Sequence, residues 1–269
     1  IHFAHQTFNW SNEAKSNAAV HVVIIGFAQF DSTNKRIFEY ENIKSNAHEK
    51  SAKNINAYLV EGDDIVIEKR RKPLCNVLNI IKGNYYAKSE GLIIEEKDLD
   101  YLVKNEPNAK KWIKLLIGAD EFINNRKRYC LWLVDCPPDE LRKMPLVMER
   151  VNRVREDRLK STDKGMQNLA PIRFRETNNP DKCIVIPVVS SEKRPYIPIG
   201  FIDKNTISTN GNLIIPNGDL FLFGQLTSLM QMSWVKYTCG RLESRFRYSK
   251  DIVYNNYPFP KNVSEKQKK

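Results

Sequence analysis

Positive charge and aromatic rings alternate near the carboxyl-terminal end of the sequence. Arg245 and Arg247 alternate with Phe246 and Tyr248, so a β-strand here would direct its cations to one face and its rings to the other. Guanidinium groups bind phosphates, and they also pair with the acceptor atoms of guanine in the major groove. On a strand, this alternation would therefore present one cationic face that suits a nucleic acid.

A second polar segment joins two expected strands. It reads Ser190-Ser191-Glu192-Lys193-Arg194-Pro195-Tyr196. Its side chains can read base edges, because Arg matches guanine, Glu accepts from the cytosine amine and Ser can do either. The composition alone is equally typical of an ordinary polar loop. The candidates for base contacts are Ser190, Ser191, Glu192, Arg194, Tyr196, Arg245 and Arg247.

Two further clusters of cations could hold phosphates. Lys69-Arg70-Arg71-Lys72 would lie in a loop after a strand, and the expected helix 145–160 carries arginines away from its apolar stripe. A solvated charge run is the alternative for the first cluster, and ion pairs along the helix are the alternative for the second. The candidates for phosphate contacts are Lys69, Arg70, Arg71, Lys72, Arg150, Arg153, Arg155, Arg158 and Lys250.

The whole chain is basic. Its 269 residues have a net charge of +11, of which residues 1–60 contribute only +1. A partner with a phosphate backbone explains the excess, and a generally basic protein is the alternative. No apolar run approaches the ~20 residues of a membrane span, so we expect no membrane partner. Five cysteines without paired spacing favour reduced thiols and a cytoplasmic location.

The glycines exclude the familiar nucleotide-cofactor loops. The closest two, Gly218 and Gly224, are six residues apart, whereas loops that cradle a pyrophosphate or an adenosyl group use close-set glycines. The sequence also contains no P-loop, no H-E-x-x-H and no C-x-x-C. We therefore expect this chain itself to hold no cofactor and no metal ion.

The hydrophobic pattern predicts an α+β fold. The β-branched run 18–26 suits a strand buried on both faces, and the polar stretch 41–56 suits a linker or an excursion out of a domain. Two long helices are expected at Pro145–Lys160 and Leu220–Tyr237. Shorter helices are expected at 98–104 and 107–117, and strands at 36–40, 57–60, 64–68, 128–134, 183–189, 196–202 and 213–216. We divide the chain into residues 1–56, 57–260 and a flexible tail, 261–269.

These segments resemble the type IIL restriction–modification enzymes, single chains in which one adenine-specific DNA methyltransferase serves both restriction and protection. Phe3–Lys15 and Ala18–Phe27 resemble the last motif block of the catalytic domain. Blocks similar to the family's target recognition domain are Gly83–Tyr85, Ile117–Asn124, Arg128–Leu133, Ser190–Pro198, Ser244–Ser249 and Asn255–Pro260. The resemblance implies a mixed β-sheet recognition domain with two long helices at 57–260. It also implies that 1–56 contain the terminal strands of a truncated α/β methyltransferase domain and a linker.

The resemblance also implies a function. The chain would bind double-stranded DNA at a specific sequence and position an adenine for N6 methylation, with an upstream methyltransferase domain of the same chain as a second partner. The S-adenosylmethionine loop and the Asn-Pro-Pro-aromatic motif of the family are absent, and the chain starts at Ile1 without methionine. We therefore expect a segment of a longer enzyme that uses S-adenosylmethionine, and Mg²⁺ for cleavage, and expect the segment alone to be inactive. Phe8 or Trp10 would stack on the flipped adenine.

Two other functions stay open. Asp135, Asp139 and Glu140 could ligate the metal of a stand-alone nuclease, although a capped helix start after Pro138 explains the same residues. The basic face could instead bind an acidic protein. Mg²⁺-dependent cleavage of DNA would favour the nuclease, and DNA binding without sequence preference would favour the interaction module.

Overall fold

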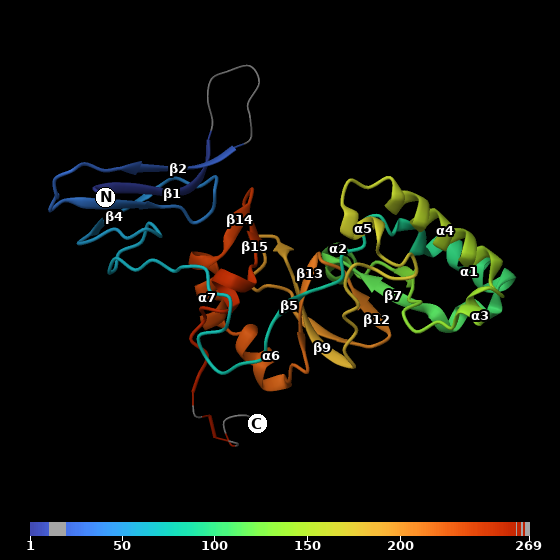
Figure 1. Ribbon diagram of the computed structural model, residues 1–269. Coiled ribbons are helices and arrows are strands. Elements are labelled where there is room, and N and C mark those ends of the chain that lie inside the picture. Colours follow the sequence, from blue (N-terminus) through green and yellow to red (C-terminus); the bar gives the residue numbers. More distant parts are fainter. Residues whose placement is uncertain (11–19, 262, 265, 267–269) are drawn as a thin grey trace, which may run out of the picture.

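The structure is a computed structural model that describes residues 1–10, 20–261, 263–264 and 266. Its strands form four small sheets, arranged in three successive parts of the molecule (Figure 1). Residues 11–19, which belong to the first resemblance block, lie outside the described residues, as does about half of the predicted tail. Among the helices described, none has the length and apolar character needed to cross a lipid bilayer.

The amino-terminal part is a four-stranded sheet in the order β2-β1-β3-β4. β1 (Phe3–Trp10) pairs antiparallel with β2 (Val20–Gly26) and parallel with β3 (Lys35–Glu39), and β4 (His48–Ala52) completes the sheet beside β3. Its small core consists of Ala4, Ile37, Ala52 and Ile55.

Three predictions for this part are wrong. β2 is an edge strand rather than one buried on both faces, and its side chains Val23, Ile24 and Ile25 are exposed. The polar stretch 41–56 contains β4 and is therefore more than a linker. Residues 57–60 and 64–68 form no strand. Leu59 has a left-handed φ of 58° and its amide closes a turn on the Asn56 carbonyl, so turn geometry outweighs the β-branched composition.

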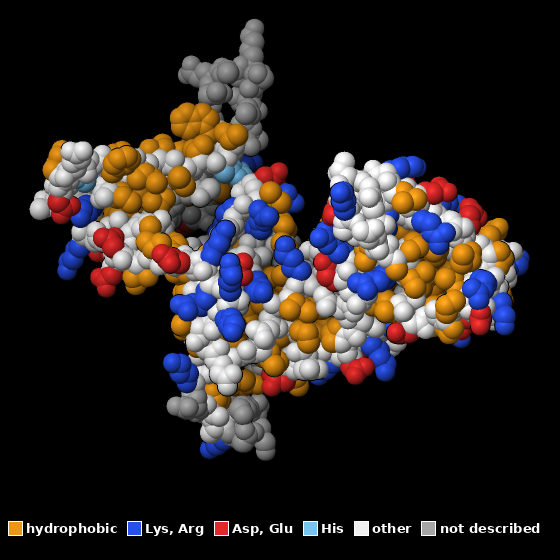
Figure 2. All heavy atoms as spheres, viewed as in Figure 1, with side chains coloured by type: hydrophobic (Ala, Val, Ile, Leu, Met, Phe, Trp, Pro, Cys, Tyr) orange, Lys and Arg blue, Asp and Glu red, His pale blue; other side chains and the backbone are white. Residues whose placement is uncertain are grey.

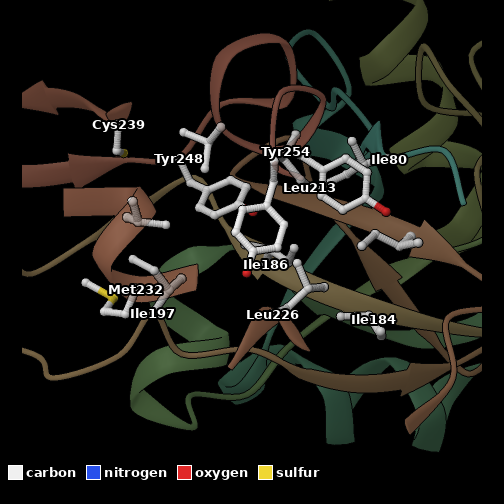
Figure 3. Packing of buried hydrophobic residues seen from close by; sticks show 14 of the residues in the cluster. Ile80, Ile184, Ile186, Ile197, Leu213, Leu226, Met232, Cys239, Tyr248 and Tyr254 are labelled. Atoms are coloured by element: carbon white, nitrogen blue, oxygen red, sulfur yellow. The ribbon is translucent and has the colours of Figure 1, made fainter. Parts of the chain in front are cut away.

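The central part contains two sheets that share one core. β11 (Gly200–Asp203), β9 (Lys182–Pro187), β13 (Asn212–Pro216) and β5 (Ile81–Lys82) form an antiparallel sheet. β10 (Val189–Ser190), β15 (Arg245–Arg247) and β14 (Gly240–Leu242) form the second sheet, and a π-helix, η3 (Lys250–Tyr254), follows it. Side chains from both sheets pack in one apolar cluster, in which Figure 3 shows Ile186, Leu213, Tyr248 and Tyr254 close together.

The second predicted long helix is broken into two. α6 (Leu220–Leu226) and α7 (Leu229–Thr238) each begin at a side-chain cap. Asp219 accepts a hydrogen bond from the Leu222 amide at 2.8 Å, and Ser228 accepts one from the Gln231 amide at 3.1 Å. Ser228 starts a new helix because its hydroxyl satisfies an amide that would otherwise lack a partner at a helix start.

The outer part is built on the sheet β12 (Thr206–Ser208), β7 (Ile113–Ile117), β8 (Arg128–Leu131) and β6 (Ile93–Glu95). Its helices are α1 (Glu96–Asn105), α2 (Ala119–Asn124), α3 (Pro138–Leu141), α4 (Pro145–Leu159) and α5 (Lys164–Gln167), with 3-10 turns η1 (Glu90–Leu92) and η2 (Pro107–Trp112). The helix prediction for 107–117 is wrong at 113–117, which form β7. The prediction for α4 is confirmed, and Val147, Val151 and Val154 are its buried stripe.

A buried polar junction joins the outer and central parts. The side chain of Asn84 donates to the carbonyls of Asn178, at 2.9 Å, and Ser208, at 3.1 Å, and it accepts from the Asn178 amide at 2.8 Å. Ser208 ends β12 of the outer sheet and Asn212 begins β13 of the central sheet, so this junction sets the geometry between them. The fold is α+β with several mixed and antiparallel sheets, as predicted.

Candidate nucleic-acid interface

Two segments predicted separately as base-contacting are neighbours in one sheet. β10 pairs antiparallel with β15, with Val189 opposite Arg247 and Ser190 opposite Phe246. The pairing continues through a hydrogen bond of 2.8 Å from the Tyr248 amide to the Val188 carbonyl. The loop after β10 therefore starts next to the cationic strand β15.

The alternation along β15 is confirmed. Arg245 and Arg247 are exposed, whereas Phe246 and Tyr248 are buried at 3% and 2% exposure. The Tyr248 hydroxyl accepts a hydrogen bond of 3.1 Å from Gln231 of α7, and burial raises the pKa of this phenol far above its ordinary value. The aromatic face thus anchors the strand in the core while the guanidinium groups remain at the surface.

The loop after β10 presents its polar side chains unequally. Arg194 and Tyr196 are exposed, Ser191 and Glu192 are half-buried, and Ser190 is buried with no hydrogen-bond partner for its hydroxyl in the described part of the chain. The position of Ser190 does not favour a direct base contact, because its hydroxyl has no access to a groove. Arg194 and Tyr196 are the loop side chains best placed to reach one.

Charged groups of this loop and of β14 influence each other. The guanidinium of Arg241 lies 4.0 Å from the centroid of the Phe246 ring. Desolvation lowers the pKa of Arg241, and the negative charge of Glu192 opposes that change.

A hollow of about 710 Å³ opens beside β15, and four cations line it. These are Lys69, Lys82, Arg247 and Lys250, and Asp251 is the single acidic residue of the lining. In Figure 2 lysine and arginine side chains gather over the region where Figure 1 shows α7, β14 and β15. Lys82 was not predicted, since an isolated lysine between Ile81 and Gly83 carries no sequence signal.

The predicted phosphate run at 69–72 is held against the carboxyl-terminal block of the chain. Asn256 accepts from Arg70 Nε at 3.3 Å and donates to the carbonyls of Glu68 and Asp251. Asn255 donates to the Arg70 carbonyl at 2.7 Å. The strand predicted before this run is absent. The hydrogen bonds hold the run next to the segment that contains Lys250, a proximity that the sequence does not predict.

The structure corrects the prediction for α4. Arg158 is 1% exposed, and its guanidinium donates to Ser89 Oγ and to the carbonyls of Lys88, Leu169, Ala170 and Arg173. A group with all its donors used inside the protein is a structural element and not a phosphate ligand.

The other arginines of α4 differ in availability. Arg150 donates to the carbonyls of Gly91 and Ile93, and Arg153 pairs with Glu149 on the same helix at 2.5 Å. Arg155 is exposed and, within the described residues, is in no ion pair. The structure therefore brings Lys69–Lys72, the loop 190–196 and β15 together, and leaves α4 in the outer part of the molecule (Figure 1).

The two candidates for stacking on a flipped base have different surroundings. Phe8 stacks on Tyr40, with ring centroids 5.1 Å apart and planes at 16°. Trp10 ends β1 and is 44% exposed, with Phe8 beside it at 6.4 Å between centroids. Trp10 consequently has the more accessible ring face.

Two of the three carboxylates considered for a nuclease, Asp139 and Glu140, have structural partners. Asp139 forms an ion pair with Arg142, and Glu140 bonds to Lys111 Nζ at 2.7 Å and Trp112 Nε1 at 2.9 Å. These hydrogen bonds lower the pKa of Glu140. Across the residues that the structure describes, no group of three or more His, Cys, Asp or Glu side chains could hold a metal ion.

Comparison with known proteins confirms the family resemblance. The family described as "MmeI, target recognition domain" matches residues 61–261, and "MmeI, DNA-methyltransferase domain" matches residues 1–39. DNA methyltransferase A of Bacillus subtilis (strain 168) is 39% identical over 264 residues, which are 97% of this chain and 29% of that protein. The solved structure of the type IIL restriction–modification enzyme MmeI in complex with DNA has a TM-score of 0.89 and 42% identity, covering 99% of this chain and 36% of that one. This chain therefore spans about a third of either relative's length, and it belongs to the MmeI family, with a segment that matches the methyltransferase domain followed by the target recognition domain.

Proposed function

We propose that this chain binds duplex DNA at a specific sequence and positions an adenine for N6 methylation by the methyltransferase domain of the same protein. The observation that carries the proposal is the pairing of β10 with β15, which joins the loop 190–196 to a strand with two exposed arginines. The family membership and the DNA complex described for MmeI support it.

The proposed contacts divide into two kinds. Arg245, Arg247, Arg194 and Glu192 would read base edges, since guanidinium groups pair with guanine and a carboxylate accepts from cytosine. Arg245 forms an exposed ion pair of 3.0 Å with Glu243 through one terminal nitrogen, so the other N–H groups of its guanidinium remain available for a base edge. Lys69, Arg70, Arg71, Lys72 and Lys250 would hold phosphates, which fix the register of the protein on the duplex.

The methylation step belongs to the longer protein. S-adenosylmethionine would supply the methyl group there, and Mg²⁺ would serve cleavage, but the described residues of this chain offer no close-set glycines and no acidic cluster for either. This chain's own part is to bind the duplex and to stack Trp10 or Phe8 on an adenine turned out of it. We also propose the domain limits 1–56, 57–260 and 261–269, and a cytoplasmic location.

The test is selection from randomised duplex DNA by the 269-residue chain, followed by mapping of methylated adenines in DNA treated with the full-length protein. We expect one enriched sequence that contains the methylated position. Binding of all duplexes with equal affinity by both forms of the protein would overturn the proposal in favour of a basic interaction module.

A further inference from the structure

The hollow beside β15 gathers four cations from separate elements around one carboxylate. Within the described residues, Lys69, Lys82, Arg247 and Lys250 take part in no ion pair, whereas Arg153, Arg245 and Lys111 each pair with a carboxylate. Four positive side chains around one hollow repel one another, and a single carboxylate, that of Asp251, lines the same hollow. An anion bound in this hollow would therefore meet positive side chains from several elements.

Apolar residues share the lining of the hollow with its cations. Ile81, Val188 and Ile252 are partly exposed there, and the cations come from separate elements. A phosphodiester fits both features, because its oxygens can meet the ammonium groups while the adjoining deoxyribose contacts these aliphatic residues. Arg247 belongs to the same lining and to β15, so a backbone held here runs directly past the proposed base-reading strand.

Lys82 is presented from a rigid backbone. It lies opposite Leu213 in the β5–β13 pair, and its carbonyl accepts a hydrogen bond of 3.2 Å from the Asn178 side chain. The next residues, Gly83 and Asn84, are buried in the junction between the central and outer sheets. A cation on such a support can fix the position of a phosphate more closely than one on a free loop.

We infer that this hollow seats a phosphate of the DNA strand that passes β15, with Lys82 as its ligand together with Lys69 and Lys250. The inference rests on the proposed function and adds to it a residue and a position. In this arrangement Arg247 lies between the residues that contact the DNA backbone and those that contact bases. The contribution of the hollow to DNA affinity is then the same for every base sequence.

The test compares Lys82→Gln with Lys104→Gln in the 269-residue chain. Lys104 is an exposed lysine of α1 in the outer part, with no ion pair in the described residues, and serves as the matched control. The affinity of each variant for a fluorescent random-sequence duplex is measured between about 50 and 300 mM KCl. Each phosphate contact is expected to contribute about −0.9 to the slope of log affinity against log salt concentration. We expect Lys82→Gln to reduce the slope of log affinity against log salt by about 0.9 and to weaken binding roughly eight-fold at 0.1 M salt.

Two further arms separate the explanations. Lys82→Arg is expected to restore the slope, and thermal unfolding of Lys82→Gln is expected at the wild-type temperature or above it, because a repulsive charge is removed. Binding of inorganic phosphate alone is measured by calorimetry in parallel.

The outcomes are distinct. A wild-type chain that binds no duplex would overturn the proposed function together with this inference. If Lys82→Gln keeps the wild-type salt slope, the inference alone is overturned. It is also overturned if Lys82→Gln loses binding of inorganic phosphate but keeps its affinity for duplex DNA, because the hollow would then be a site for free phosphate.

Discussion

Val189 lies opposite Arg247 in the antiparallel pair of β10 and β15. This one register joins a polar loop to a cationic strand that is far away in the sequence, and Arg247 of that strand lines the hollow together with Lys69, Lys82 and Lys250. A recognition surface made this way has base-reading and phosphate-holding groups on neighbouring elements, so changes at single residues should separate the two activities.

Arg247→Gln should relax preference at one base pair. Loss of a bidentate contact to guanine costs roughly 1–3 kcal/mol of discrimination, while the cations that hold phosphates remain. The measurement is the sequence logo obtained by selection from randomised duplexes. Arg142→Gln is the matched control, because Arg142 is an exposed arginine paired with Asp139 on α3. An unchanged logo for Arg247→Gln would remove this residue from the base contacts.

Arg158→Met should destabilise the fold without altering the salt dependence of DNA binding. The substitution removes a buried guanidinium and leaves the partly buried carbonyls of Lys88, Leu169, Ala170 and Arg173 without their donor, at a cost of about 3 kcal/mol in the free energy of unfolding. Arg155 is exposed on the same helix, so Arg155→Met should change the free energy of unfolding by less than ~0.5 kcal/mol. Urea unfolding checks both values. A smaller salt slope for correctly folded Arg158→Met would contradict its structural assignment.

Trp10→Ala should impair base flipping by the full-length protein. Stacking of a base on an aromatic ring contributes about 1–3 kcal/mol, and Trp10 is the exposed aromatic at the end of β1. The measurement is the fluorescence of 2-aminopurine at the mapped target position, which rises when that base leaves the stack. Phe8→Ala should instead lower stability, because Phe8 already stacks on Tyr40. If Phe8→Ala stays stable but loses the fluorescence change while Trp10→Ala keeps it, Phe8 and not Trp10 is the residue that stacks on the flipped base.

The free energy of unfolding should fall above pH 9. Burial raises the pKa of Cys183 and of Cys239 from 9.0 to about 11, and that of Cys130 to about 12. As the pH passes 9, the unfolded chain loses these protons before the folded chain does, so the stabilisation present below pH 9 is lost as the pH approaches 11.

Each such thiol contributes up to ~1.4 kcal/mol per pH unit. Urea unfolding of Cys183→Ala between pH 8 and 10.5 should show a shallower decline, by about that amount per unit, than the wild type. Cys75→Ala is the control at a half-buried cysteine. Parallel pH profiles for wild type and Cys183→Ala would show that this thiol is not linked to folding.

Local features of the fold were predictable where short-range chemistry decides them. Pro145 in the first turn and the stripe of Val147, Val151 and Val154 determine α4, and the alternation from Arg245 to Tyr248 predicts β15 with its two faces. The secondary-structure prediction was wrong where pairing with a distant strand or the geometry of a turn determines the local conformation. The run 113–117 is a strand because it pairs with β8, and the β-branched residues of β2 are exposed because that strand lies at an edge.

The sequence by itself determined the family, the concentration of positive charge after residue 60 and the residue types suited to DNA. Only the tertiary structure decided which of those cations are free. Arg158 is one of several arginines on a helix and Lys82 is an isolated lysine, yet Arg158 gives all its donors to groups inside the protein and Lys82 lines an open hollow. The reason is physical: a cation binds DNA only if no internal group has already satisfied its hydrogen bonds, and those groups lie far away in the sequence.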